Sequence, residues 1–221
     1  MSRLRPALTP RGSGTTTVLL ACGVAGGPVF VAVFLIAGAL RPGYDAAQVP
    51  VSLLTLGPGG WVQVANFLVF GMLTIAFAAG LRRTGPYRTG ATLLLLVGIG
   101  LLGSGLFRPD PGAGYPPGTA ATESWHGAVH GWCAILFIGG LVAACLALAR
   151  HGRRWWRWYG ILSAILIAGF FVASLAVSPQ AADLAGADGG LLERVAGVVG
   201  PVWMCVLAVR TLRTDRSRPR S

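Results

Sequence analysis

The chain has 221 residues, of which 54% are apolar and only 11% are charged, and its mean hydropathy is +0.67. The apolar share exceeds what a soluble core of this length buries, so the composition excludes a small soluble globular protein. The formal net charge is +11, from 18 arginines against 7 acidic residues, but no contiguous basic face or recognition motif accompanies it, and we expect no nucleic-acid partner.

Six stretches are long and apolar enough to cross a bilayer, which takes about 20 helical residues. In chain order they run over residues 17–40, 61–81, 89–107, 126–148, 158–177 and 191–209. They lack the alternation of a membrane barrel strand, so we expect helices. The last is the weakest, because Glu193 and Arg194 fall in its first turn and Pro201 interrupts its middle.

These spans predict an all-α integral membrane protein, a six-helix bundle made of three helical hairpins. The bundle occupies residues 17–209, between a basic N-terminal tail, 1–16, and a disordered basic C-terminal tail, 210–221. The first span has one competing interpretation, a cleavable signal peptide, because Ala37-Gly38-Ala39 resembles a cleavage site. Its apolar run is longer than the roughly 7 to 15 residues of a signal peptide, so we expect it to be retained.

The charges differ between the two sides of the predicted bundle. Fifteen of the eighteen arginines lie in the two tails and in the second and fourth connections, whereas six of the seven acidic residues lie on the other side. The positive-inside rule then predicts cytoplasmic termini and outward-facing long loops. The run from Arg153 to Trp158 resembles an interfacial anchor, so we expect membrane lipids as partners, with anionic lipid at the cytoplasmic face.

Polar side chains gather at the outer ends of the first four spans. The predicted ligand-binding residues are Arg41, Tyr44, Asp45, Ser52, Arg108, Asp110, His126 and His130. Ion pairs of Arg41 with Asp45 and of Arg108 with Asp110 are expected to hold the loops over the bundle. The leading hypothesis is a pocket that faces outward and binds a lipid headgroup or small amphiphile without a cofactor.

His126 and His130 are four residues apart and therefore share one side of a helix. They support two interpretations: structural hydrogen bonding, or a zinc site completed by Asp110 or Glu123. The second implies a metal-dependent hydrolase of a lipid amide or ester, with Ser52 or Arg41 stabilising the oxyanion. With no complete catalytic motif, whether the protein is an enzyme stays open.

A small transporter is the third hypothesis. Ion-driven transporters usually carry ionisable groups near the membrane midplane. In this sequence the charges within a predicted span are Glu193 and Arg194, at its edge. Transport therefore ranks below the other two.

Several motifs resemble those of one known family. They are Gly27-Pro28, Arg41-Pro42-Gly43-Tyr44-Asp45, Val51-Ser52-Leu53-Leu54, Gly60-Trp61, Gly105-Leu106-Phe107-Arg108-Pro109-Asp110-Pro111 and His126-Gly127-Ala128-Val129-His130. The chain resembles, over residues 18–209, the DUF 998 family of prokaryotic six-span membrane proteins of unknown function. The resemblance implies six helices and a site built from Asp45, Ser52, Asp110, His126 and His130. We expect the protein to lie in a bacterial plasma membrane. Arg108 departs from the family's aromatic-Pro-Asp pattern.

Overall fold

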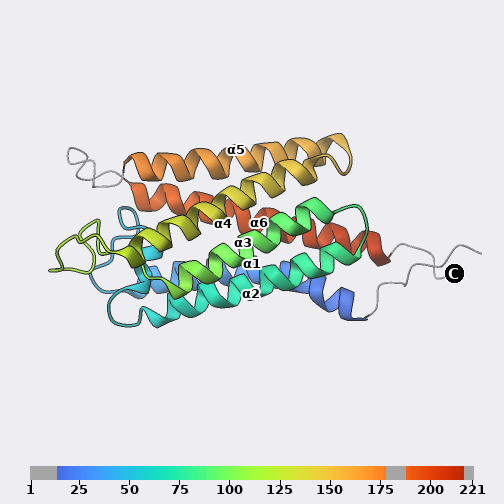
Figure 1. The fold of residues 1–221 in the computed structure, drawn as a ribbon. Helices are drawn as coiled ribbons and strands as arrows, with labels where there is room; N and C mark the ends of the chain where they lie inside the picture. The colour runs from blue at the N-terminus through green and yellow to red at the C-terminus, as the bar shows by residue number, and fades with distance from the viewer. Residues whose placement is uncertain (1–13, 178–187, 217–221) are drawn as a thin grey trace, which may run out of the picture.

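The computed structural model describes residues 14–177 and 188–216, where the chain forms six long α-helices and one short 3-10 helix, η1 (Figure 1). In order these are α1 (Gly14–Leu40), η1 (Val51–Thr55), α2 (Trp61–Arg83), α3 (Arg88–Leu106), α4 (Trp125–Ala149), α5 (Arg154–Ala176) and α6 (Gly189–Arg216). All six long helices are apolar and long enough to cross a membrane. The predicted fold, an all-α bundle of six membrane-spanning helices, is confirmed.

The six helices form a closed ring. Each packs against its neighbours in chain order, and α6 packs against α1 to close it. The connections 41–60 and 107–124 lie at one end, which we call the long-loop end, and the tight connections 84–87 and 150–153 lie at the opposite, short-loop end (Figure 1). The described chain begins and ends at the short-loop end.

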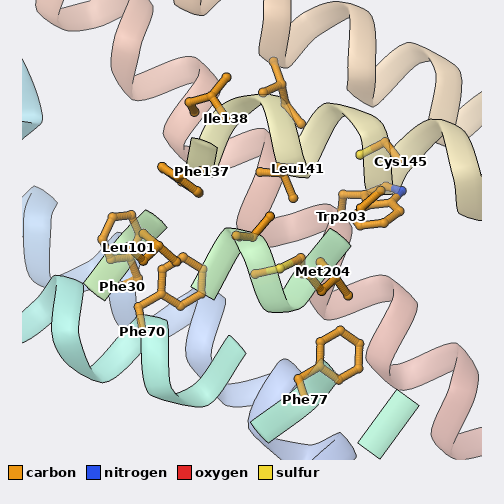
Figure 2. Close-up of a cluster of buried hydrophobic side chains, with 14 of the residues drawn as sticks. Phe30, Phe70, Phe77, Leu101, Phe137, Ile138, Leu141, Cys145, Trp203 and Met204 are labelled. Carbon is orange, nitrogen blue, oxygen red and sulfur yellow. The ribbon is translucent and has the colours of Figure 1, made fainter. Parts of the chain in front are cut away.

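Large apolar side chains fill the ring from its middle toward the short-loop end. Phe77, Leu141 and Trp203 are fully or almost fully buried and meet in one cluster (Figure 2). Close backbone contacts support the cluster: a Cβ on Gly27 would lie 2.6 Å from the carbonyl oxygen of Pro201. Small residues allow such contacts between helices in a lipid environment.

Helix α5 begins at Arg154, earlier than predicted, so most of the arginine and tryptophan run is helical. The interpretation of the whole run as a surface anchor is wrong for Trp156, which is 0% exposed and donates its indole N–H to the Leu148 carbonyl at 2.9 Å. Trp155 and Trp158 are exposed, and their anchoring role stays a prediction. Helical periodicity explains the difference, because adjacent residues point to different sides of a helix.

Helix α6 differs from its prediction at both ends. It begins at Gly189, which puts Arg194 in the second turn, where the side chain is buried rather than at the edge of the span. It also continues to Arg216, into the segment expected to be a disordered tail. Arg210 supports this extension by donating to the His151 carbonyl at 3.0 Å and by lying over the Trp156 ring. The remaining tail predictions, residues 1–13 and 217–221, fall outside the described residues.

Candidate functional site

A cavity of about 270 Å³ lies inside the ring, in its long-loop half. All six helices and η1 contribute to its lining. Most of the wall is apolar, with Phe30, Phe34, Phe67 and Phe137 among its residues. The polar lining residues are Ser52, Ser104, His130, Ser174 and Glu193. Such a mixture of apolar walls and a few convergent polar groups is typical of a small-molecule site.

His130 and Ser104 supply hydrogen-bonding capacity that the protein itself does not use up. The Nδ1 atom of buried His130 lies 2.8 Å from the Phe107 carbonyl oxygen. Because a carbonyl only accepts, the hydrogen is assigned to Nδ1, which leaves the Nε2 lone pair as an acceptor. The imidazole also interacts with the backbone carbonyl of Ser104. The Ser104 hydroxyl, on a residue that is 2% exposed, has no hydrogen-bond partner within residues 14–177 and 188–216. Both side chains line the cavity.

Glu193 contributes a carboxyl group to the same cavity from α6. The backbone N–H groups of Val51 and Ser52, at the start of η1, interact electrostatically with it. The first N–H groups of a helix have no partner within the helix and carry partial positive charge, so they stabilise an anion. The sequence places Glu193 far from η1, and the fold brings the two together.

Arg194 connects the first long loop to α6. Its Nη1 donates to the carbonyls of Val49, at 3.0 Å, and Gly190, at 2.9 Å, and its Nη2 donates to the Tyr44 hydroxyl. The Tyr44 hydroxyl donates in turn toward the carbonyls of Val49 and Pro50. Burial raises the pKa of the Tyr44 phenol despite the neighbouring guanidinium, so this group stays a neutral donor.

Arg41 connects the first long loop to the second. It donates to the Leu56 carbonyl at 3.0 Å and to the Tyr115 hydroxyl at 3.4 Å. Tyr115 is buried, and its ring packs edge-on against Tyr44 at 5.2 Å between centroids. Arg41 and Tyr44 therefore support the loop that carries η1 and do not line the cavity.

The two predicted aspartates stabilise local backbone structure. Asp110 accepts hydrogen bonds from the Ser124 N–H, at 2.8 Å, and the Ser124 hydroxyl, at 2.6 Å. The Ser124 hydroxyl caps α4 by accepting from the Gly127 N–H. Asp45 accepts from the Ala47 N–H within a turn. The expected ion pairs with Arg41 and Arg108 are wrong, because in this described region the carboxylates bond to these nearby groups instead.

The predicted zinc ligands do not converge. His126 is exposed and stacks on Trp125, with 3.5 Å between ring centroids, whereas His130 is buried one turn further along. Within residues 14–177 and 188–216, no group of three histidine, cysteine, aspartate or glutamate side chains is arranged to hold a metal ion. Arg108 is exposed as well. Of the eight predicted binding residues, Ser52 and His130 line the cavity.

The predicted set of binding residues left out the other polar lining residues, Ser104, Ser174 and Glu193. It also left out two residues that support the first long loop, Tyr115 and Arg194. The sequence does contain a signal for Glu193 and Arg194 in α6, because ionisable side chains within a membrane span usually have a function. Glu193 and Arg194 are absent from the predicted site because the predicted start of the sixth span places them at its edge. No comparable signal marks the two serines, which are common in membrane helices.

The Asp110 carboxylate, which holds the cap residue Ser124, leaves no room for a side chain at Gly127. A Cβ at this position would overlap the Asp110 carboxylate. We expect Gly127→Ala to displace that carboxylate and to lower the free energy of unfolding by about 1 kcal/mol, the usual value of a helix cap. Thermal unfolding in detergent measures the loss. Gly139→Ala is the matched control, because a Cβ on this exposed glycine meets nothing within 4 Å; equal stability of the two variants would contradict the prediction.

Neither the curated proteins nor the solved structures contain a match to this chain. A family model described as "Protein of unknown function (DUF998)" matches residues 24–210, which cover nearly all of the six-helix ring. The resemblance carried by the sequence motifs is thereby confirmed. The chain is a multi-pass membrane protein that belongs to the DUF998 family.

Proposed function

We propose that this protein binds a small amphiphile in the cavity of its long-loop half. The observation that carries the proposal is the combination of aromatic walls with hydroxyl, imidazole and carboxyl groups in one cavity. An apolar chain gains free energy against such walls, and the polar groups are available to its head. The sequence predicts a pocket under the first two long loops, and the cavity lies within the long-loop half of the ring.

The size of the cavity favours a ligand with one chain. Its volume of about 270 Å³ lies just below the range of about 300–1,000 Å³ that is typical of ligand pockets. A space of this size suits one short chain and a compact head. The body of a two-chain lipid is too large for it, so the ligand is a single-chain amphiphile or one end of a larger molecule.

The ligand reaches the cavity from the bilayer, between α4 and α5. Two lining residues on these helices, Ile135 and Leu175, are 54% and 60% exposed. The cavity therefore extends to the outer surface of the ring at this seam. In Figure 1, α4 runs close to α5 at the short-loop end and away from it toward the long-loop end. In a membrane, this surface faces lipid.

The arginine distribution supports the orientation in a bacterial plasma membrane. Arg82, Arg83, Arg150 and Arg153 flank the connections of the short-loop end, which we assign to the cytoplasm and to contact with anionic lipid. The cavity then faces the outer half of the bilayer. The hydrolase and transporter hypotheses stay predictions, because no feature of the cavity favours either over binding.

The amphiphile proposal is tested by filling the cavity. Ala134 lines it, so Ala134→Phe should occupy the space of the ligand. With 1-decanol as the probe, we expect a rise in the thermal unfolding midpoint of the unchanged protein and at least a tenfold weaker affinity in the variant. Ala128→Phe, the same change at an exposed position of α4, is the matched control. A folded Ala134→Phe variant that binds 1-decanol as before would refute the proposal.

A further inference from the structure

We propose that the polar end of the cavity selects a single-chain alkylammonium, an amphiphile whose cationic head donates hydrogen bonds. In this proposal the Glu193 carboxylate binds the charged head. This inference rests on the proposed function and adds to it the chemical class of the ligand.

The lining accepts hydrogen bonds and offers no strong cation. Glu193 contributes a carboxyl group, and the free Nε2 of His130 accepts. No arginine is among the lining residues that the structure describes. The two nearest loop-supporting arginines are engaged elsewhere: Arg41 with the carbonyls of Leu54 and Leu56, and Arg194 with those of Val49 and Gly190. A phosphate or carboxylate head would meet the Glu193 carboxyl group, and the Arg194 guanidinium that acts on Glu193 electrostatically does not itself line the cavity.

Glu193 retains acceptor capacity for a ligand. An ionised carboxyl group has about four lone-pair sites. The N–H groups of Val51 and Ser52 account for two interactions, and the side chain still lines the open space. Hydrogen bonds between a carboxylate and an ammonium are roughly twice as strong as those between neutral groups. An ammonium head therefore gains more from Glu193 than a hydroxyl head does.

The unpartnered Ser104 hydroxyl is an independent indication of a ligand. It is 2% exposed and lines the cavity, yet it has no hydrogen-bond partner among the residues that the structure describes. Buried polar atoms nearly always have partners, so an exception needs an explanation. An ammonium supplies three donors, enough to reach the Ser104 oxygen, the Glu193 carboxylate and the His130 Nε2. Nearby, Ser174 uses its hydroxyl hydrogen on the Gly189 carbonyl, so it too is left as an acceptor.

The test compares three probes with the same ten-carbon chain: decylamine, 1-decanol and decanoate. At neutral pH the amine is protonated and the acid is ionised, so the three differ in head charge. Affinities are measured by thermal shift on the purified full-length protein, on Glu193→Gln and on Glu123→Gln. Glu123 is an exposed acid at the same end of the molecule, so its variant controls for general surface charge.

We expect the unchanged protein and Glu123→Gln to bind decylamine about tenfold more tightly than 1-decanol and decanoate least tightly, a ratio that equals about 1.4 kcal/mol. In Glu193→Gln, the amine and the alcohol should bind within about twofold of each other. Ser104→Ala provides a second, smaller change, with an expected loss of about threefold in decylamine affinity.

The outcomes separate this inference from the proposed function. Binding of none of the three probes would refute the amphiphile site itself. Binding of all three with decanoate equal to or tighter than decylamine would refute the charge selection and leave the amphiphile site standing. If a folded Glu193→Gln variant kept the tenfold preference for decylamine over 1-decanol, a group other than Glu193 would bind the charged head, and the role proposed for Glu193 would be refuted. If that variant does not fold, an undiminished decylamine affinity in Ser104→Ala overturns the proposed head contacts.

Discussion

Replacing Arg194 with methionine is expected to lower the free energy of unfolding by about 3 kcal/mol. The side chain is buried, and its guanidinium satisfies the carbonyls of Val49 and Gly190 and the hydroxyl of Tyr44. Methionine has a similar length but donates nothing, so these oxygens lose a buried donor. Part of the loss is offset because an arginine charge no longer has to be buried.

The loss should extend to the loop that carries η1. Arg194 and Tyr44 hold this loop against α6, where the Leu191 N–H also donates to the Ala47 carbonyl at 2.8 Å. Chemical or thermal unfolding in detergent measures the stability, and limited proteolysis of the loop reports its release. Arg108→Met is the matched control, because Arg108 is exposed at the same end of the molecule; it should change stability by no more than about 0.5 kcal/mol. Similar unfolding of both variants would mean that the Arg194 network contributes nothing.

Replacing Trp156 with alanine is expected to have the largest effect, a loss of about 3–5 kcal/mol. The indole is fully buried and stacks near Trp203, with 6.1 Å between ring centroids. It also donates to the Leu148 carbonyl and lies under the Arg210 guanidinium, at 4.5 Å. Alanine would leave a large cavity, would remove one of the hydrogen bonds to the Leu148 carbonyl, and would leave Arg210 with only its longer contact with the Trp155 ring, at 5.8 Å.

Trp158 provides the comparison, since it lies two residues further along α5 and is 58% exposed. Trp158→Ala should change the unfolding midpoint little, whereas Trp156→Ala should lower it strongly in the same detergent. Tryptophan fluorescence would also separate the two sites, because removal of the buried indole takes away an emitter shielded from quenchers in solution. An equal effect of the two substitutions would contradict the assignment of Trp156 to the core.

The spacing of His126 and His130 predicts that both histidines contribute to one site, but in the structure only His130 lines the cavity. His126 and His130 share a helix side, because four residues turn an α-helix by only about 40° beyond a full rotation. His126 nevertheless stacks on Trp125 at the exposed start of α4, and His130 is enclosed by the ring. Whether a position is enclosed depends on how far the neighbouring helices extend, and that information is not local.

The sequence by itself determined the number of spans, the approximate limits of most helices and the family. Hydropathy and length decide whether a segment crosses a bilayer, and both are properties of the segment alone. Only the tertiary structure decided which polar groups share a cavity. These spans are apolar on all sides, so their pattern does not fix which side of each helix faces inward. The contact of Arg194 with Tyr44 joins positions 150 residues apart, and it forms only because α6 closes the ring against α1 and the loop that follows it.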